Sequence, residues 1–369
     1  MRKRTNRLDR VTEFIFISII PFVLTVTLML GGPENSIEKL IKTGYYISNP
    51  NEIADNYDME IGIISGKQAL SDGEISEYVS SSTIYSVPED IDKLMKEAEE
   101  KYSDSVPAGN ITEKDYSKQN ATSEYDGVYV RNTTLSHDID ISEYLSRRVY
   151  ADIDKSKPSV LIYHTHTSES YELLDRGFYS DDRASRNDNA AENMIRVGEA
   201  VCSVLEENGF KTIHDKTVYD ETLSGAYDRA RENISKILKE NPSIQVVLDI
   251  HRDSIYLKDG TRIKTVSQIN GEKVAQIMIT TGCEDGNVTD FPNWEKNLTF
   301  ALNLQQSLVR EAPSLMRPLN LAGRKYNMDL MPCALHIEIG TDANTLTEAV
   351  NSATIFGEAL SKLLKGYEI

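Results

Sequence analysis

The feature that most constrains this chain is an alternation of short apolar segments with segments of helical period, which runs from about residue 158 to the C-terminus. Short Val- and Ile-rich segments are typical of buried strands, and apolar residues spaced three and four apart are typical of helices packed on a sheet. The predicted elements are, in chain order, a strand 159–163, a helix 187–208, a strand 210–213, a helix 223–240, strands 244–250 and 274–281, a helix 293–311, a strand 333–339 and a helix 342–364. This order predicts a three-layer α/β domain with a mainly parallel sheet, which binds ligands outside the carboxyl ends of its strands.

Side chains that can bind a metal or move a proton stand at the ends of three predicted strands. His166 and Glu169 follow the first strand, His251 follows the third, and Glu338 stands at the end of the last. Imidazole and carboxylate groups suit a catalytic zinc ion, which needs three protein ligands and one open position. We predict that His166, Glu169 and His251 bind Zn²⁺, and that Glu338 is the general base that takes a proton from a water activated by the metal.

The other histidines have different predicted roles. In an extended chain His164 lies on the same side as His166. It could therefore replace His166 as a metal ligand, or contact that ligand without binding the metal itself. His336, two positions before the predicted base, is expected to be buried with a backbone partner. We interpret His137 and His214 as structural residues.

The N-terminus predicts a membrane anchor. Five basic residues among the first ten precede an uncharged run, 14–30, and the sequence Gly31-Gly32-Pro33 then favours the end of a helix. A cleavable signal peptide is the competing interpretation, but no A-x-A pattern follows the run. We therefore predict a cytoplasmic tail and a transmembrane helix in residues 1–32, which places the rest of the chain outside the cytoplasm at the cell membrane.

Residues 33–125 are expected to be an acidic extracytoplasmic spacer, because helical periodicity is convincing only over 90–102. The catalytic domain is predicted to occupy residues 126–369. A net charge of −18 argues against a nucleic-acid partner, since phosphate contacts require clustered Lys and Arg. The three cysteines are too far apart for a zinc ribbon or a disulfide framework, and we predict that they are buried apolar residues.

Several motifs together resemble one known family. They are VLIYHTHTSESY (160–171), NMIRVG (193–198), IHDKTVYD (213–220), LDIHRDS (248–254), NWEKNLTFAL (293–302), RKYN (324–327) and HIEIGTDANTLTEA (336–349). In this order they closely resemble the stage II sporulation protein P family, and the resemblance extends from about Val128 to the C-terminus.

The resemblance implies an enzyme of the cell wall. Members of the family are zinc-dependent N-acetylmuramoyl-L-alanine amidases that degrade septal peptidoglycan during engulfment in sporulation, and their catalytic domain has a cell-wall amidase-like (phosphorylase/hydrolase-like) fold. By match, the metal ligands are His166, Glu169 and His251, and the essential acid is Glu338 in an E-x-G setting. The resemblance also implies two partners, a lytic transglycosylase and a polytopic membrane scaffold of the engulfment complex.

This chain departs from typical cell-wall amidases in two places. Residues 163–166 stand where those enzymes have a glycine-rich turn, and His336 stands where an aliphatic residue is expected. The second ligand of those enzymes opens the following helix, which makes Glu192 a competitor of Glu169 for the ligand role.

Two other functions fit the same residues. A zinc-dependent endopeptidase or carboxypeptidase of the cell wall also uses such a donor set, and a carboxypeptidase needs a cation for the terminal carboxylate, with Arg252 or Arg324 as candidates. Arg252 could equally orient a ligand or pair internally with Asp253. A scaffolding module with a vestigial zinc site is the non-enzymatic alternative. Trp294 could line a glycan groove or anchor a helix.

Overall fold

The computed structural model describes residues 77–78 and 87–369, which belong to one compact unit, Asp58–Ile369. The main sheet of these described residues has eight strands. In spatial order they are β3 (Ser123–Tyr125), β4 (Val128–Asn132), β12 (Leu319–Ala322), β11 (Ile277–Gly282), β13 (Ala334–Thr341), β8 (Val246–Asp253), β5 (Pro158–Tyr163) and β7 (Lys211–His214).

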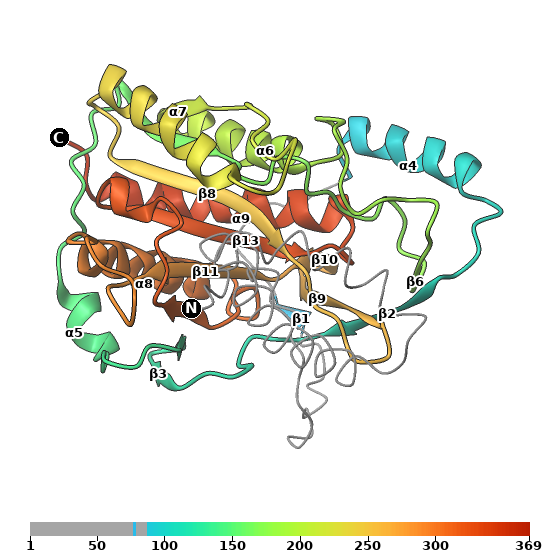
Figure 1. Ribbon diagram of the computed structural model, residues 1–369, viewed down its shortest axis with the longest axis horizontal. Helices are drawn as coiled ribbons and strands as arrows, with labels where there is room; N and C mark the ends of the chain where they lie inside the picture. The colour runs from blue at the N-terminus through green and yellow to red at the C-terminus, as the bar shows by residue number, and fades with distance from the viewer. Residues whose placement is uncertain (1–76, 79–86) are drawn as a thin grey trace, which may run out of the picture. The chain divides into compact units, whose positions relative to one another are not determined.

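Strand direction confirms the predicted α/β class. Strands β7, β5, β8 and β13 run parallel to one another, as do β4, β12 and β11. The two groups meet as an antiparallel pair between β13 and β11, and Figure 1 shows β8, β13 and β11 side by side. Because β5, β8 and β13 run the same way, the segments that follow them leave the sheet at one edge.

Helices cover both faces of this sheet. Along β8, Leu248 and Ile250 join the larger apolar core with α6, α8 and α9, whereas Val247 joins a smaller core with α7. This alternation follows from the pleat, which turns successive side chains to opposite faces. The helices of the described residues are α4 (Glu89–Lys101), α5 (Ile141–Ser146), α6 (Met194–Glu207), α7 (Ala226–Glu240), α8 (Trp294–Glu311), α9 (Leu346–Lys365) and the 3-10 turn η1 (Met328–Leu330).

Helix α6 begins seven residues later than predicted. Asparagine side chains hold the preceding segment in turns, because Asn187 accepts a hydrogen bond from the backbone of Asn189, which in turn accepts one from Ala191. Asn193 then caps α6 through the backbone N–H of Ile195. Such side chains compete with helical hydrogen bonds, so the apolar periodicity alone placed the helix start too early.

The predicted strand 274–281 is two strands, β10 (Glu272–Ala275) and β11, which belong to different sheets. The chain crosses from one sheet to the other at Gln276, whose buried side chain accepts a hydrogen bond from the backbone of Tyr116 and donates one to Ser314. Strand β8 also extends beyond the prediction, to Asp253. Strands β9 and β12 were not predicted.

The second sheet incorporates residues that the sequence assigned to the spacer. Its strands are β1 (Glu77–Tyr78), β9 (Arg262–Ile269), β2 (Gly109–Lys114), β6 (Phe178–Tyr179) and β10, which pairs with β9. Ile91 and Ala98 of α4 are buried in the larger core, and β2 pairs in parallel with β9. The folded unit therefore begins upstream of the predicted boundary at residue 126. Strand β2 is polar and only partly buried, which explains why it carries little sequence signal.

The predicted anchor, 14–30, and the first part of the predicted spacer, 33–76, lie outside the described residues. Across residues 77–78 and 87–369, no helix has both the length and the apolar character needed to cross a membrane.

Candidate metal centre

Strand alternation places four polar side chains on one face of the sheet. Asp249 and His251 of β8 alternate with residues of the larger core, and so do His336 and Glu338 of β13. In the parallel register, Asp249 lies opposite His336 and His251 lies opposite Glu338. All four side chains therefore point to the face of the sheet that α7 covers nearer the N-terminal ends of these strands.

A turn after β5 brings His166 and Glu169 to the same place. The backbone N–H of Glu169 donates to the carbonyl of His166, and the hydroxyl of Thr167 donates to the carbonyl of His164. The ring of His166 lies edge-on to that of His251, with 5.2 Å between the centroids. Oε2 of Glu169 lies 3.3 Å from Nδ1 of His251. The structure thus brings together all four residues that the sequence proposed as ligands and base.

Two carboxylates make this site favourable for a positive charge. Burial alone would lower the pKa of His251, but Asp249 and then Glu169 hold that pKa well above its usual value. Burial would likewise raise the pKa of Glu169, yet the hydrogen bond and charge of His251 hold it well below its ordinary value. A divalent cation would satisfy the same two carboxylates as an imidazolium does.

The donor atoms fit a metal ion. Among the proposed ligands, His166 has a buried Nδ1 that makes no hydrogen bond with the described residues. Burial lowers the pKa of His166 to about 4, so its ring is neutral, as a ligand requires. Two ligands of one tetrahedral zinc ion lie roughly 3.3 Å apart, which is the observed separation of Glu169 and His251. Among the described residues, the group whose ligand atoms all lie within 4.8 Å of one another is a different one, Asp249, His251 and His336, which is the competing donor set.

His336 has a side-chain partner, contrary to the expectation of a backbone partner. Its Nε2 donates to Oε1 of Glu338 over 2.7 Å, and its ring stacks on that of His251 with 4.3 Å between the centroids. The register of β13 shifts directly after Glu338, where Gly340 adopts a φ of +67°. A Cβ at Gly340 would lie 2.7 Å from Oδ1 of Asn344, so only glycine fits this part of the E-x-G motif.

His164 lies on the opposite face from the site. The extended chain ends at Tyr163, and the turn that follows separates His164 from His166, so the expectation of a shared side was wrong. Nδ1 of His164 donates to the carbonyl of Ile250 over 2.8 Å, and its Nε2 accepts from Nε2 of His214 over 2.9 Å. Burial lowers the pKa of His164 to about 4, which keeps this pair neutral.

Replacing Gly198 with alanine tests the packing behind the site. A Cβ at Gly198 of α6 would lie 2.6 Å from Nε2 of His164 and 2.7 Å from Nε2 of His214. We expect the free energy of unfolding to fall by about 1–3 kcal/mol, as in other overpacked cores, although alanine favours a helix over glycine. Thermal unfolding measures this loss. Ser203→Ala, an exposed change on the same helix, is the control, and an unchanged or raised Tm for Gly198→Ala would show that the histidine pair tolerates the methyl group.

Glu192, the competitor of Glu169 for the ligand role, has other partners. It accepts hydrogen bonds from Arg183 at 3.0 Å, and from Asn187 and Asn189 at 2.9 Å each. Glu169, in contrast, directly contacts His251. These contacts favour Glu169 as the ligand.

The two charged neighbours of Glu169 have different environments. Arg252 is buried, and its guanidinium donates to the carbonyls of Ser170, Ser185 and Asp253, while Asp253 pairs with Arg317 instead. Arg252 therefore supports the turn, and the predicted Arg252–Asp253 side-chain pair is not formed. Arg186 is partly exposed and contacts Glu169 at 3.3 Å and Asp220 at 2.9 Å, so it helps to hold Glu169 in place.

Two tyrosines that sequence reasoning missed form a wall beside the histidines. The ring centroid of Tyr227, on α7, lies 5.6 Å from that of His166, and that of Tyr326 lies 5.2 Å from both Tyr227 and His336. Tyr326 adopts a positive φ, which is uncommon for a bulky residue and is often found at functional sites. The RKYN motif was the one available signal for Tyr326.

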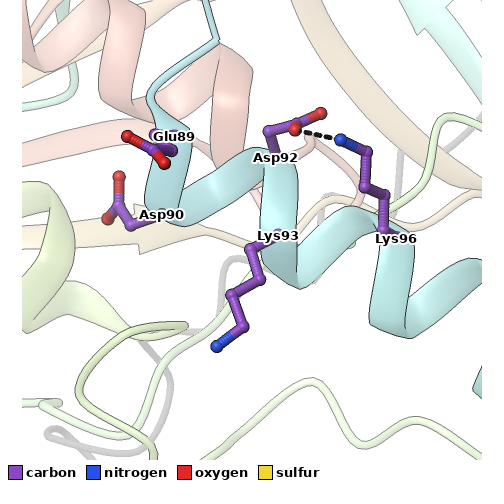
Figure 2. A pocket seen from close by; sticks show the side chains of 5 residues that line it. All are labelled: Glu89, Asp90, Asp92, Lys93 and Lys96. Carbon is purple, nitrogen blue, oxygen red and sulfur yellow. Dashed lines mark hydrogen bonds and ion pairs between the residues drawn. The ribbon is translucent and has the colours of Figure 1, made fainter.

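Other predicted residues lie apart from the centre. Trp294 is half-buried at the start of α8 and packs against both apolar cores, which supports its interpretation as an anchor. Cys202, Cys283 and Cys333 are buried free thiols, as predicted. A surface hollow at the start of α4 is lined only by Glu89, Asp90, Asp92, Lys93 and Lys96 (Figure 2). None of the proposed ligands borders this hollow.

Comparison with known proteins gives a family match over most of the chain. The family model described as stage II sporulation protein P matches residues 54–361, a range that includes all four predicted site residues. A curated protein of that name from Bacillus subtilis (strain 168) is 30% identical over 219 residues, which are 56% of this chain and 51% of the relative. The chain thus aligns with about half the length of that relative.

Solved structures give more distant matches. The N-acetylmuramoyl-L-alanine amidase AmiC2 of Nostoc punctiforme is 12% identical, with a TM-score of 0.34, and the match covers 58% of this chain and 98% of that one. The N-acetylmuramyl-L-alanine amidase Ami1 of Mycobacterium smegmatis is 11% identical, with a TM-score of 0.35, and the match covers 59% of this chain and 98% of that one.

Proposed function

The chain belongs to the stage II sporulation protein P family, and from this premise we propose that it is a zinc-dependent N-acetylmuramoyl-L-alanine amidase. Its substrate would be peptidoglycan, and the bond cleaved would be the amide between N-acetylmuramic acid and the L-alanine of the stem peptide. The observation that carries the proposal is the convergence of His166, Glu169, His251 and Glu338 from three strand ends on one edge of the sheet.

In this proposal His166, Glu169 and His251 hold the zinc ion. When bound, the metal supplies Lewis acidity, which polarises the scissile carbonyl and lowers the pKa of a water molecule. Arg186 and the backbone N–H of Arg252 keep the carboxylate of Glu169 ionised and oriented, through contacts of 3.3 Å and 3.2 Å. The wall of Tyr227 and Tyr326 limits the access of water from one side.

Glu338 is proposed as the general base and acid. Its Oε1 is fixed by His336, whereas Oε2 is buried and has no hydrogen-bond partner among the described residues. Oε2 can therefore take a proton from the attacking water as the oxygen bonds to the carbonyl carbon. When the carbon–nitrogen bond breaks, the same atom returns the proton to the leaving amine of L-alanine, and a muramoyl carboxylate remains.

The alternative of a cell-wall carboxypeptidase loses one of its two candidate cations. Arg252 donates its guanidinium hydrogens to three backbone carbonyls and is buried, so it cannot also bind a terminal carboxylate of the substrate. An endopeptidase needs no such cation and remains the second candidate reaction for the same centre.

Location and partners are also part of the proposal. The basic N-terminus and the apolar run 14–30 would anchor the chain in the cell membrane, with the catalytic unit on the extracytoplasmic side. We propose a lytic transglycosylase and a polytopic membrane scaffold of the engulfment complex as partners, on the basis of family membership alone.

Digestion of purified sacculi by the full chain in detergent, with the products identified by mass spectrometry, tests the proposed reaction. We expect glycan strands without peptide and intact stem peptides that begin with L-alanine, and we expect a chelator to abolish both products. Cleavage confined to bonds within the peptides would favour the endopeptidase. Zinc binding without any cleavage would favour a scaffolding role.

A further inference from the structure

The two ring nitrogens of His251 face different acidic residues. Nδ1 lies 3.3 Å from Oε2 of Glu169, and Nε2 lies 2.8 Å from Oδ1 of Asp249. A neutral imidazole has one lone pair and one N–H, so only one of these nitrogens can bind a metal, and the other must carry the hydrogen. The identity of the metal-binding nitrogen decides the role of Asp249.

The Nδ1 side has the geometry of a metal site. Glu169 and Nδ1 of His251 are separated by the distance expected for two ligands of one ion. The ring of His166 lies edge-on to that of His251, with 5.2 Å between the centroids, and its buried Nδ1 makes no hydrogen bond among the described residues. This side therefore offers two donors at ligand spacing, and the proposed third ligand, His166, lies in the turn that also carries Glu169.

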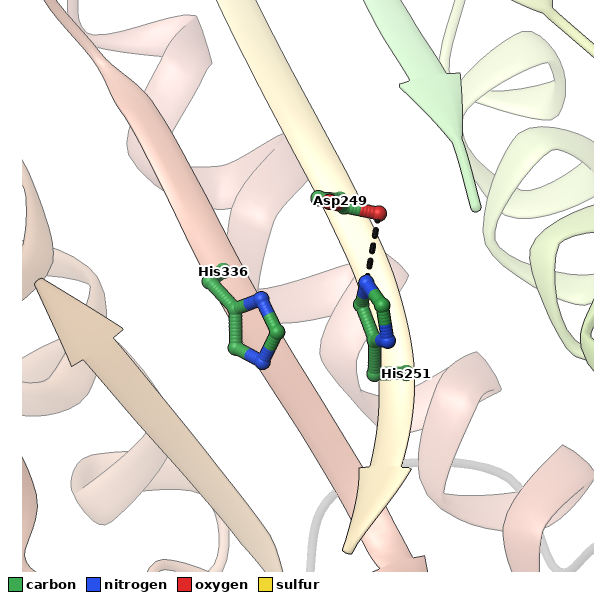
Figure 3. Close-up of side chains that lie close together, drawn as sticks. All are labelled: Asp249, His251 and His336. Atoms are coloured by element: carbon green, nitrogen blue, oxygen red, sulfur yellow. Dashed lines mark ion pairs between the residues drawn. The ribbon is translucent and has the colours of Figure 1, made fainter. Parts of the chain in front are cut away.

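On the Nε2 side, Asp249 is fixed by other protein contacts. The backbone N–H of Thr165 donates to Oδ1 of Asp249 over 2.8 Å, and the Thr165 hydroxyl donates to Oδ2 over 2.6 Å. Asp249 is 1% exposed, so these two bonds fix its carboxylate in one orientation. Figure 3 shows this carboxylate directed at the ring of His251, with His336 on the neighbouring strand.

Asp249 lies close enough to His251 for its charge to act on the position of the ring hydrogen. The approach of Nε2 to Oδ1 is close but not aligned as a hydrogen bond. Even so, a carboxylate oxygen at this distance attracts an N–H and repels a nitrogen lone pair. Glu169 faces Nδ1 in the same way over the longer distance of 3.3 Å, but a metal ion bound between Glu169 and Nδ1 would take that lone pair and leave the hydrogen to Nε2. Hydrogen on Nε2 leaves the lone pair on Nδ1, which faces Glu169.

We propose that Asp249 is a positioning residue that holds the Nε2 hydrogen of His251 and so directs Nδ1 at the metal, with Thr165 fixing the carboxylate. This inference rests on the proposed metal centre of His166, Glu169 and His251. Carboxylate partners of metal-binding histidines fix the tautomer and orientation of the ring, and their loss typically weakens metal binding about 10–100-fold.

Zinc affinity of the full chain in detergent, measured by competition with a chromogenic chelator, tests the assignment. Asp249→Ala is expected to weaken zinc binding about 10–100-fold, and Asp249→Asn, which keeps an oxygen acceptor, is expected to have a smaller effect. His166→Ala is expected to lose more affinity than either variant, because it removes a ligand. His336→Gln is expected to keep its zinc. With cobalt in place of zinc, the visible spectrum of Asp249→Asn should keep the intensity of a four-coordinate site, with shifted bands.

Other outcomes would overturn the inference. If both Asp249 variants and His336→Gln lost their zinc while His166→Ala kept it, the metal would lie among Asp249, His251 and His336. Asp249 variants with the affinity of the unmodified chain would remove any positioning role. A chain that bound no zinc in any form would instead contradict the proposed function itself. Melting curves recorded without metal identify any variant that fails to fold.

Discussion

Replacing Glu338 with glutamine is expected to lower the rate of amide hydrolysis by about a hundred- to ten-thousand-fold, the usual contribution of a general acid–base residue. Glutamine has nearly the same shape and can still accept from His336 through its amide oxygen, but it cannot take a proton from water. Because Glu338 is not one of the proposed ligands, the variant should bind zinc as tightly as the unmodified chain. Turnover of a soluble muramoyl-peptide, measured together with zinc content, checks both expectations.

A matched control separates loss of the base from a general effect of the substitution. Glu240→Gln, an exposed change at the end of α7, should leave turnover unchanged. Loss of zinc from Glu338→Gln would show that Glu338 is itself a ligand. Turnover within a few-fold of normal, with zinc retained, would require another base, and His336 would be the nearest group to examine.

The sequence predicted the location of the centre better than its internal arrangement. The convergence of His166, Glu169, His251 and Glu338 could be predicted because parallel strands deliver their carboxyl ends to one edge of the sheet, and the roles of the four residues stay predictions. The contacts of Asp249 and His336 could not be found in this way. They depend on the register between β8 and β13, which no local pattern specifies.

The elements before residue 126 were difficult to predict for a different physical reason. Strand β2 pairs with β9, more than a hundred residues later, and its own side chains are mostly half-buried, so it has neither an apolar run nor a clear alternation. Helical periodicity over 90–102 indicated helix α4, and in the structure Ile91 and Ala98 bury one stripe of this mostly charged segment. The sequence therefore identified the helix without showing that it packs on the larger apolar core.

Replacing Lys264 with methionine is expected to lower the free energy of unfolding by about 3–5 kcal/mol, the cost of leaving a buried charge without its partner. Lys264, on β9, is 1% exposed, and its ammonium lies 2.6 Å from Glu348 of α9, 2.8 Å from Asp175 and 3.2 Å from Glu113 of β2. It thus connects the second sheet to a helix of the larger core. Methionine fills a similar volume but leaves the buried Glu348 with no positive partner. Chemical denaturation of the full chain measures the difference.

The neighbouring Lys273 provides the control, because it contacts Glu113 and Asp175 but is nearly half exposed. Lys273→Met should lower the free energy of unfolding by no more than about 1 kcal/mol.

The pH dependence of the Lys264→Met effect gives an independent test. Burial raises the pKa of Glu348, against the opposing effect of Lys264, so without Lys264 the folded state holds a proton at Glu348 to still higher pH. When the pKa of Glu348 is higher in the folded state than in the unfolded state, ionisation of Glu348 destabilises the fold. This destabilisation is absent at pH values below the unfolded-state pKa and is largest above the folded-state pKa. The loss caused by Lys264→Met should therefore be smaller at about pH 5 than at about pH 8. A loss independent of pH would mean that it arises from packing and not from the charge of Glu348.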